Sequence, residues 1–140
     1  MWYNPLIKWL LRSPLHFTVS KSMMTMTYKG RKSGKIYTTP MSYLEIGNAL
    51  YTISSRERLW WRNLRGGTEV SLRLRGKDKA ARSETLENPT EVASSLSQYF
   101  TSAPQLAKYM DVRINNDNLP NPQDISRLAQ ENVIVRTDLK

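Results

Sequence analysis

The chain has 140 residues, 39% of them hydrophobic, so one domain with one core is expected. It holds no cysteine and a single histidine, His16, which excludes disulfides and cysteine catalysis and makes a zinc, haem or other metal site unexpected. The formal net charge of +9 points to an anionic partner, which could be nucleic acid, an anionic membrane surface or a phosphorylated small molecule.

Residues 1–20 are predicted to form a helical extension of a single domain that covers residues 1–140. The apolar stretch 6–11 fits a short helix that is apolar nearly all round, and it is expected to pack on the domain. It is too short to span a bilayer and no small-residue cleavage site follows it, so the chain is expected in the cytoplasm. The alternative is peripheral contact of residues 1–12 with the inner face of the membrane, for which Trp2 and Trp9 are suited.

Two strand-like segments, 22–29 and 36–46, are separated by a basic loop at residues 30–35. The loop contains two glycines, three cations and one hydroxyl, a composition that suits a tight turn able to cradle a phosphate. It is not a P-loop, because only three residues separate the glycines and Ile36 follows the last lysine. The alternative is a solvated basic hairpin loop.

Further strands follow at short intervals. Pro40 within 36–46 indicates an edge position or a bulge. Strict alternation over 69–75 predicts a strand that buries Val70, Leu72 and Leu74. The other predicted strands are 49–53 after a turn at Gly47-Asn48, 79–86 after a turn at 76–78, and 133–135. This spacing favours a small barrel or a strongly curled antiparallel sheet.

Two helices and a loop are predicted between these strands. Ser54 and Glu57 form a capping-box pattern that predicts a helix over 54–64, ended by Gly66-Gly67. Its adjacent tryptophans point about 100° apart, so one is expected in the core and the other against a flat ligand. Asn88-Pro89 predicts a second helix up to about residue 100, and 115–123 is predicted as a loop.

The chain offers little catalytic machinery of its own. No Ser/His/Asp set can be assembled around His16, and no paired carboxylates in apolar surroundings stand out. A protein with an anion cradle and no such groups is suited to bind a cofactor that supplies the chemistry.

Four short motifs together resemble the deazaflavin (coenzyme F-420)-dependent nitroreductase and quinone reductase family, over roughly residues 6–86. They are Gly30-Arg31-Lys32-Ser33-Gly34-Lys35, Thr39-Pro40, Ser54-Ser55-Arg56 and Trp60-Trp61-Arg62-Asn63-Leu64. The resemblance implies a fold that is mainly β with flanking helices (α+β), a split β-barrel similar to FMN-binding proteins. It also implies hydride transfer from reduced coenzyme F-420, an 8-hydroxy-5-deazaflavin, to a quinone, a nitroaromatic or another electron-poor acceptor.

The resemblance also implies the site residues. For the phosphate and acidic tail of the coenzyme they are Arg31, Lys32, Ser33 and Lys35. For the strand under the deazaflavin ring they are Thr39, Pro40 and Met41, and for the ring edge and linker they are Ser54, Ser55 and Arg56. Trp60 would border the ring, Trp61 and Tyr109 would meet the substrate, and Tyr99 is a further candidate. The chain departs from the family pattern at Tyr37, which replaces a common cation.

Two other functions stay open at this point. One is an FMN-dependent split-barrel reductase, a class that often forms dimers, and the chain is expected to be a monomer or a homodimer. The other is a basic module that binds nucleic acid or an anionic membrane without catalysis. Nucleic acid is not expected as a partner, because the cations Arg73, Arg75, Lys77, Lys79 and Arg82 fit the solvated face of a hairpin.

Overall fold

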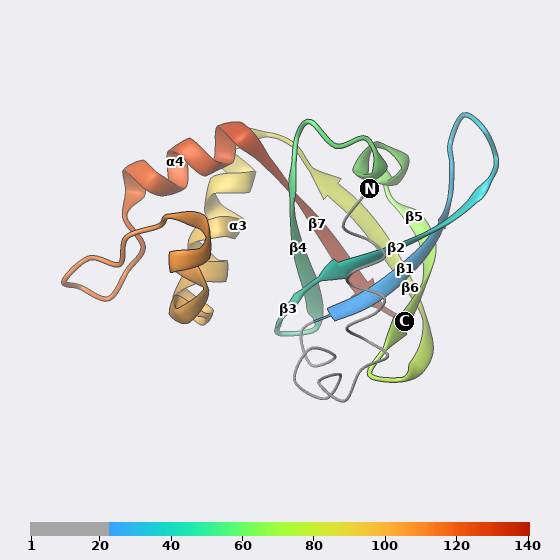
Figure 1. The fold of residues 1–140 in the computed structure, drawn as a ribbon, viewed down its shortest axis with the longest axis horizontal. Helices are drawn as coiled ribbons and strands as arrows, with labels where there is room; N and C mark the ends of the chain where they lie inside the picture. Colours follow the sequence, from blue (N-terminus) through green and yellow to red (C-terminus); the bar gives the residue numbers. More distant parts are fainter. Residues whose placement is uncertain (1–22) are drawn as a thin grey trace.

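The computed structural model describes residues 23–140, so the expectations for the N-terminal segment, its membrane contact included, lie outside the described residues. Seven antiparallel strands form one curled sheet in the order β2-β1-β5-β6-β7-β4-β3 (Figure 1). The strands are β1 (Met23–Lys29), β2 (Ile36–Ser42), β3 (Leu44–Ile46), β4 (Ala49–Ser55), β5 (Thr68–Leu74), β6 (Lys77–Leu86) and β7 (Asn132–Leu139). The predicted split barrel with flanking helices is confirmed.

The predicted alternation in β5 is confirmed, since Val70, Leu72 and Leu74 are all buried. The turn before β6 lies one position earlier than predicted, at Arg75 and Gly76, which both have positive φ. A two-residue turn of this kind matches the twist of the strands that it joins.

The predicted strand 36–46 is divided into β2 and β3 at Tyr43, which is 4% exposed in the barrel core. Pro40 lies in β2 and pairs with Thr25, and β2 is an edge strand as expected. Proline is tolerated there because it has no N–H to give to a further strand.

The predicted helix over 54–64 is wrong. Ser54 and Ser55 end β4, where they pair with Val133 and Asn132 of β7, and only a short 3-10 helix, η1 (Trp60–Leu64), follows. No side chain caps η1. The backbone of Ser54 is paired with β7, so Ser54 is not the N-cap residue of a helix and the capping box does not form.

A helical lobe covers the outer side of β4 and β7 (Figure 1). It consists of α3 (Pro89–Ser102), η2 (Pro104–Met110) and α4 (Pro122–Glu131). The helix after Asn88-Pro89 is confirmed, with the Asn88 side chain accepting N–H groups of the first turn. Asn121-Pro122 starts α4 in the same way, which shortens the predicted 115–123 loop. No helix within residues 23–140 is both long and apolar enough to cross a membrane.

The strand β7 separates two hydrophobic cores. Val133 and Val135 face the barrel core, which includes Met26 and Leu72, whereas Ile134 faces the helical lobe. Burial on both faces explains why this strand is an uninterrupted apolar run in the sequence.

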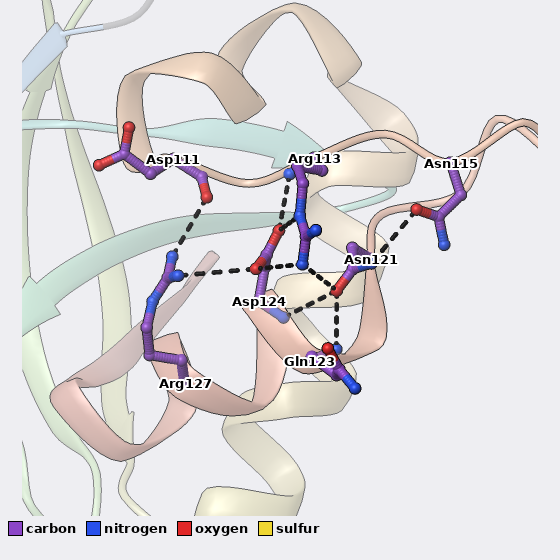
Figure 2. Close-up of polar contacts among 7 residues, drawn as sticks. All are labelled: Asp111, Arg113, Asn115, Asn121, Gln123, Asp124 and Arg127. Atoms are coloured by element: carbon purple, nitrogen blue, oxygen red, sulfur yellow. Dashed lines mark hydrogen bonds and ion pairs between the residues drawn. The ribbon is translucent and has the colours of Figure 1, made fainter.

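A buried carboxylate anchors the loop 111–121 to α4 (Figure 2). Asp124 accepts hydrogen bonds from the Arg113 side chain, at 2.9 and 3.2 Å, and from the Arg113 backbone N–H at 2.9 Å. Arg127 lies 3.6 Å from the same carboxylate and donates to the backbone carbonyl of Asp111. The hydrogen bonds from the Arg113 side chain and backbone lower the pKa of Asp124 below its ordinary value of 3.8.

We expect this carboxylate to make the protein sensitive to acid. A carboxyl whose pKa is lowered by folding stabilises the protein above its unfolded pKa, and this contribution is lost as the pH falls through the folded pKa. Asp124→Asn should therefore be less stable than wild type in urea at pH 7, with a difference that shrinks as the pH falls below about 3.8. A difference that stays constant with pH would contradict this role for the Asp124 charge.

Candidate functional site

Three adjoining hollows form one groove along β2, the end of β4, η1 and the loop 30–35. The apolar hollow, about 510 Å³, is lined by Met23, Thr39, Pro40, Met41, Ser42, Thr52, Ile53, Ser54, Ser55, Arg58 and Trp60. The middle hollow, about 1040 Å³, shares Thr39, Arg58 and Trp60 with it and also includes Tyr28, Tyr37 and Arg62. The basic hollow, about 520 Å³, shares Arg31, Lys32, Asn63 and Arg65 with the middle one and also includes Lys29.

The hollows differ in chemistry. The apolar hollow has mainly hydroxyl and hydrocarbon walls with one arginine, Arg58, and the part of its lining that lies within residues 23–140 contains no carboxylate and no histidine. Among the described residues, those that line the middle and basic hollows include one carboxylate, Glu57, and six cations, Lys29, Arg31, Lys32, Arg58, Arg62 and Arg65. The groove therefore suits a ligand that has a flat uncharged part at one end and several negative charges at the other.

The two tryptophans of η1 face different surroundings, as predicted. Trp61 is 3% exposed in the barrel core, and its indole N–H donates to the carbonyl of Ser55 at 3.1 Å. Trp60 is partly buried, borders the apolar and middle hollows, and donates its indole N–H to Ser54 Oγ at 3.0 Å. The division into one core and one groove tryptophan therefore holds, and the groove tryptophan is Trp60.

Trp60 belongs to an aromatic wall made with Tyr28 and Tyr37. The Tyr28 ring centroid lies 6.3 Å from that of Trp60, and Tyr37 stacks on Tyr28 at 5.9 Å. Such aromatic contacts fix ring positions beyond what burial alone provides. Tyr37 thus contributes an aromatic ring where the family pattern has a cation.

The loop 30–35 is held in a closed turn. The Gly30 N–H donates to the carbonyl of Lys35 at 2.7 Å, and the Gly34 N–H donates to the carbonyl of Gly30 at 2.9 Å. Gly34 has a φ of +70°, and a Cβ on Gly30 would lie 2.7 Å from both Ser33 Oγ and a ring carbon of Tyr37. Both glycines are therefore required by geometry.

Asn63 connects this loop to η1. Its Oδ1 accepts the backbone N–H of Arg31 at 3.1 Å, and its Nδ2 donates to the carbonyl of Trp60 at 3.0 Å. The Asn63 side chain thus connects the loop 30–35 to the aromatic wall. The motif that carried the resemblance contains Asn63, but the sequence alone did not indicate this role.

Most of the predicted site residues come together in the groove. These are Arg31, Lys32, Ser33, Thr39, Pro40, Met41, Ser54, Ser55 and Trp60. Lys35, Arg56, Trp61 and Tyr109 do not line it. Tyr109 lies on η2 and is 75% exposed, and Tyr99 packs against Phe100 in the core of the helical lobe.

Arg56 has a structural position in this fold. Its Nη2 donates to the backbone carbonyls of Glu87, at 2.6 Å, and Ala129, at 3.0 Å, which joins the end of β4 to the helical lobe. Arg58, two residues on, lines both the apolar and the middle hollow instead. The sequence analysis did not predict Arg58, Arg62 and Arg65 as site residues, although their close spacing in the sequence indicates a concentration of positive charge.

Comparison with models of protein families shows the family to which the chain belongs. Residues 15–117 match the model of the F-420H(2)-dependent quinone reductase family, and the chain belongs to this family. The resemblance drawn from the sequence is confirmed at the level of a deazaflavin-dependent reductase. A search of the curated proteins finds no significant match.

Solved structures support the fold. A protein of unknown function from Agrobacterium tumefaciens is 13% identical with a TM-score of 0.53, covers 94% of this chain, and is itself covered over 58% of its length. A conserved hypothetical protein from Mycobacterium tuberculosis is 15% identical with a TM-score of 0.52, and 89% of this chain and 79% of that one are covered. An F-420-H2-dependent reductase is 18% identical with a TM-score of 0.52, and 86% of this chain and 95% of that one are covered.

Proposed function

We propose that this member of the F-420H(2)-dependent quinone reductase family transfers hydride from reduced coenzyme F-420 to a quinone, with the coenzyme held in the groove described above. The observation that carries the proposal is that the apolar hollow adjoins the cation-lined middle hollow, which in turn adjoins the basic hollow. A nitroaromatic or another flat electron-poor compound is a second acceptor class, since the apolar hollow presents hydrocarbon and hydroxyl walls to either.

The residues present fit the coenzyme. Its conjugated ring is flat, and its tail carries a phosphodiester and glutamates, so it needs a narrow apolar slot that continues into a cationic channel. Thr39, Pro40 and Met41 would lie along the ring, with Ser54 and Ser55 at its edge and Trp60 as its border. Arg31, Lys32 and Ser33 would hold the phosphate. When bound, the coenzyme supplies the hydride and the electronic structure that makes hydride transfer possible.

The contribution of the protein is binding, orientation and exclusion of water. The hydrogen bond from Trp60 to Ser54 fixes the indole as a wall of the apolar hollow. The Asn63 bridge holds the cationic loop at a constant distance from that wall. We assign to Arg58 the contact with the ring edge or linker that the resemblance gave to Arg56, because Arg58 lies where the apolar and middle hollows meet.

FMN is the alternative cofactor, and a paired titration distinguishes the two. We expect the protein to bind oxidised coenzyme F-420 more tightly than FMN, because the longer acidic tail of the coenzyme can contact cations in both the middle and the basic hollow. Quenching of the fluorescence of each ligand on titration with protein measures both affinities. Lys77→Ala removes one positive charge at an exposed position outside the groove and serves as the control for net charge. Tight FMN binding without a response to the deazaflavin would refute the proposal.

A further inference from the structure

Tyr28 and Thr39 form a hydroxyl pair at the junction of the apolar and middle hollows. The Tyr28 hydroxyl lies 2.9 Å from Thr39 Oγ1, and the two residues are 5% and 6% exposed. Tyr28 lines the middle hollow, whereas Thr39 lines both hollows. The pair thus reaches from the cationic part of the groove to the wall of the apolar hollow.

Besides Thr39, four hydroxyl residues line the apolar hollow, Ser42, Thr52, Ser54 and Ser55, and the hydroxyls of the last three are bound to the backbone or to the indole. Thr52 Oγ1 donates to the carbonyl of Ser42 at 2.8 Å. Ser54 Oγ contacts the carbonyl of Ser55 at 3.4 Å and accepts the Trp60 N–H. Ser55 Oγ accepts the backbone N–H of Glu57 at 3.3 Å.

Thr39 is the hydroxyl of this wall that is paired with a titratable side chain. Within residues 23–140, the side chains that line the apolar hollow include no histidine, carboxylate, lysine or tyrosine. Reduction of a quinone to a hydroquinone takes one hydride and one proton, and among the described residues this pair links a titratable side chain to the apolar hollow.

We propose that Tyr28 and Thr39 form the proton relay to the acceptor. The inference rests on the proposed function, since it requires the acceptor to lie in the apolar hollow. As hydride from the reduced coenzyme reaches the acceptor, the O–H bond of Thr39 breaks and a new O–H bond forms on the acceptor oxygen. Thr39 takes the phenolic proton of Tyr28, and the phenolate regains a proton from water in the middle hollow. The quinone becomes a hydroquinone and the coenzyme is oxidised.

The surroundings of Tyr28 suit this role. Burial raises the pKa of Tyr28, the hydrogen bond with Thr39 lowers it, and the neighbouring Tyr37 raises it again. The phenol therefore stays protonated at neutral pH and always has a proton to give. Thr39, which does not ionise in this range, contributes by its position, because it lines the apolar hollow and Tyr28 does not.

Two variants and one control test the relay. Tyr28→Phe keeps the ring and removes the phenolic proton, and Thr39→Val keeps the side-chain shape and removes the hydroxyl that links Tyr28 to the acceptor. The control is Tyr109→Phe, which removes a phenolic hydroxyl from an exposed residue that lines none of the three hollows. We expect kcat for a neutral quinone to fall roughly a hundredfold in the first two variants, the lower end of what a positioned acid contributes. Tyr109→Phe should stay close to wild type.

A second acceptor separates proton delivery from damage to the site. Methylene blue is a cation that becomes neutral on taking up hydride alone, so in Tyr28→Phe and Thr39→Val its reduction should fall far less than that of the quinone. Because Thr39 is placed along the coenzyme ring, the two acceptors are compared at saturating coenzyme, and the affinity for oxidised coenzyme is measured for each variant. In the protein without coenzyme, near-ultraviolet titration of wild type minus Tyr28→Phe reports the phenol, and its pKa should rise further in Thr39→Val.

Equal losses with quinone and methylene blue would overturn the relay and make the pair structural. Quinone turnover at the wild-type rate in Tyr28→Phe would also overturn it while leaving the proposed function intact. If Tyr28→Phe does not fold, Thr39→Val alone decides, because it leaves every aromatic ring in place. A wild-type protein that binds no deazaflavin would refute the proposed function itself, and the relay with it.

Discussion

Replacing Trp61 by alanine is expected to lower the free energy of unfolding by about 3–5 kcal/mol, the usual cost of removing a large aromatic side chain from a core. Trp61 is 3% exposed, packs in the barrel core and donates its indole N–H to the carbonyl of Ser55. Its ring also lies under the guanidinium groups of Arg62 and Arg65, at 5.6 and 5.2 Å. Urea denaturation followed by circular dichroism measures the loss.

The neighbouring substitution Trp60→Ala is the matched control, because it removes the same side chain from the groove wall. We expect a smaller loss of stability than for Trp61 and a clear loss of affinity for oxidised coenzyme, since Trp60 is only partly buried and borders two hollows. The prediction is wrong if Trp60→Ala unfolds the protein to the same extent, or if Trp61→Ala impairs binding while remaining stable.

Strands with a local signature were predictable from the sequence. The alternation of Val70, Leu72 and Leu74 encodes one buried face, and Asn88-Pro89 encodes a helix start, so both could be placed without knowledge of the rest of the chain. Ser54 and Glu57 carry an equally good local signature, yet the helix does not form there. Pairing of β4 with β7, a strand some eighty positions later, extends the strand through Ser55, and no local pattern reports that pairing.

The same limit applies to the groove. The loop 30–35 is a local turn, and its glycines and cations could be read directly as an anion cradle. Arg56 was expected beside it, but its guanidinium is held by the carbonyl of Ala129, 73 residues away. The contacts of Asn63 with the loop and of Tyr28 with Thr39 also join separate elements. Such positions are set by tertiary packing, so residue type and spacing alone do not reveal them.

The cationic loop gives the second large effect. Arg31→Ala and Lys32→Ala are each expected to weaken the binding of oxidised coenzyme by roughly tenfold or more. A hydrogen bond to a charged group contributes about 1.5–3 kcal/mol, and about 1.4 kcal/mol is a tenfold change in affinity. Both residues line the middle and basic hollows, and neither forms an ion pair with another described residue, so their charge is available to a ligand.

Salt and stability measurements show whether the loss arises from the ligand contact. The effect of each substitution should shrink as the ionic strength rises, because screening weakens the attraction that the substitution removes. Both side chains are exposed, so the melting temperature should hardly change, and Lys77→Ala should leave the affinity close to that of wild type. A lower melting temperature with unchanged affinity would show instead that Arg31 and Lys32 maintain the turn. The cradle would then have to be assigned to Arg58, Arg62 and Arg65, which also line the middle hollow.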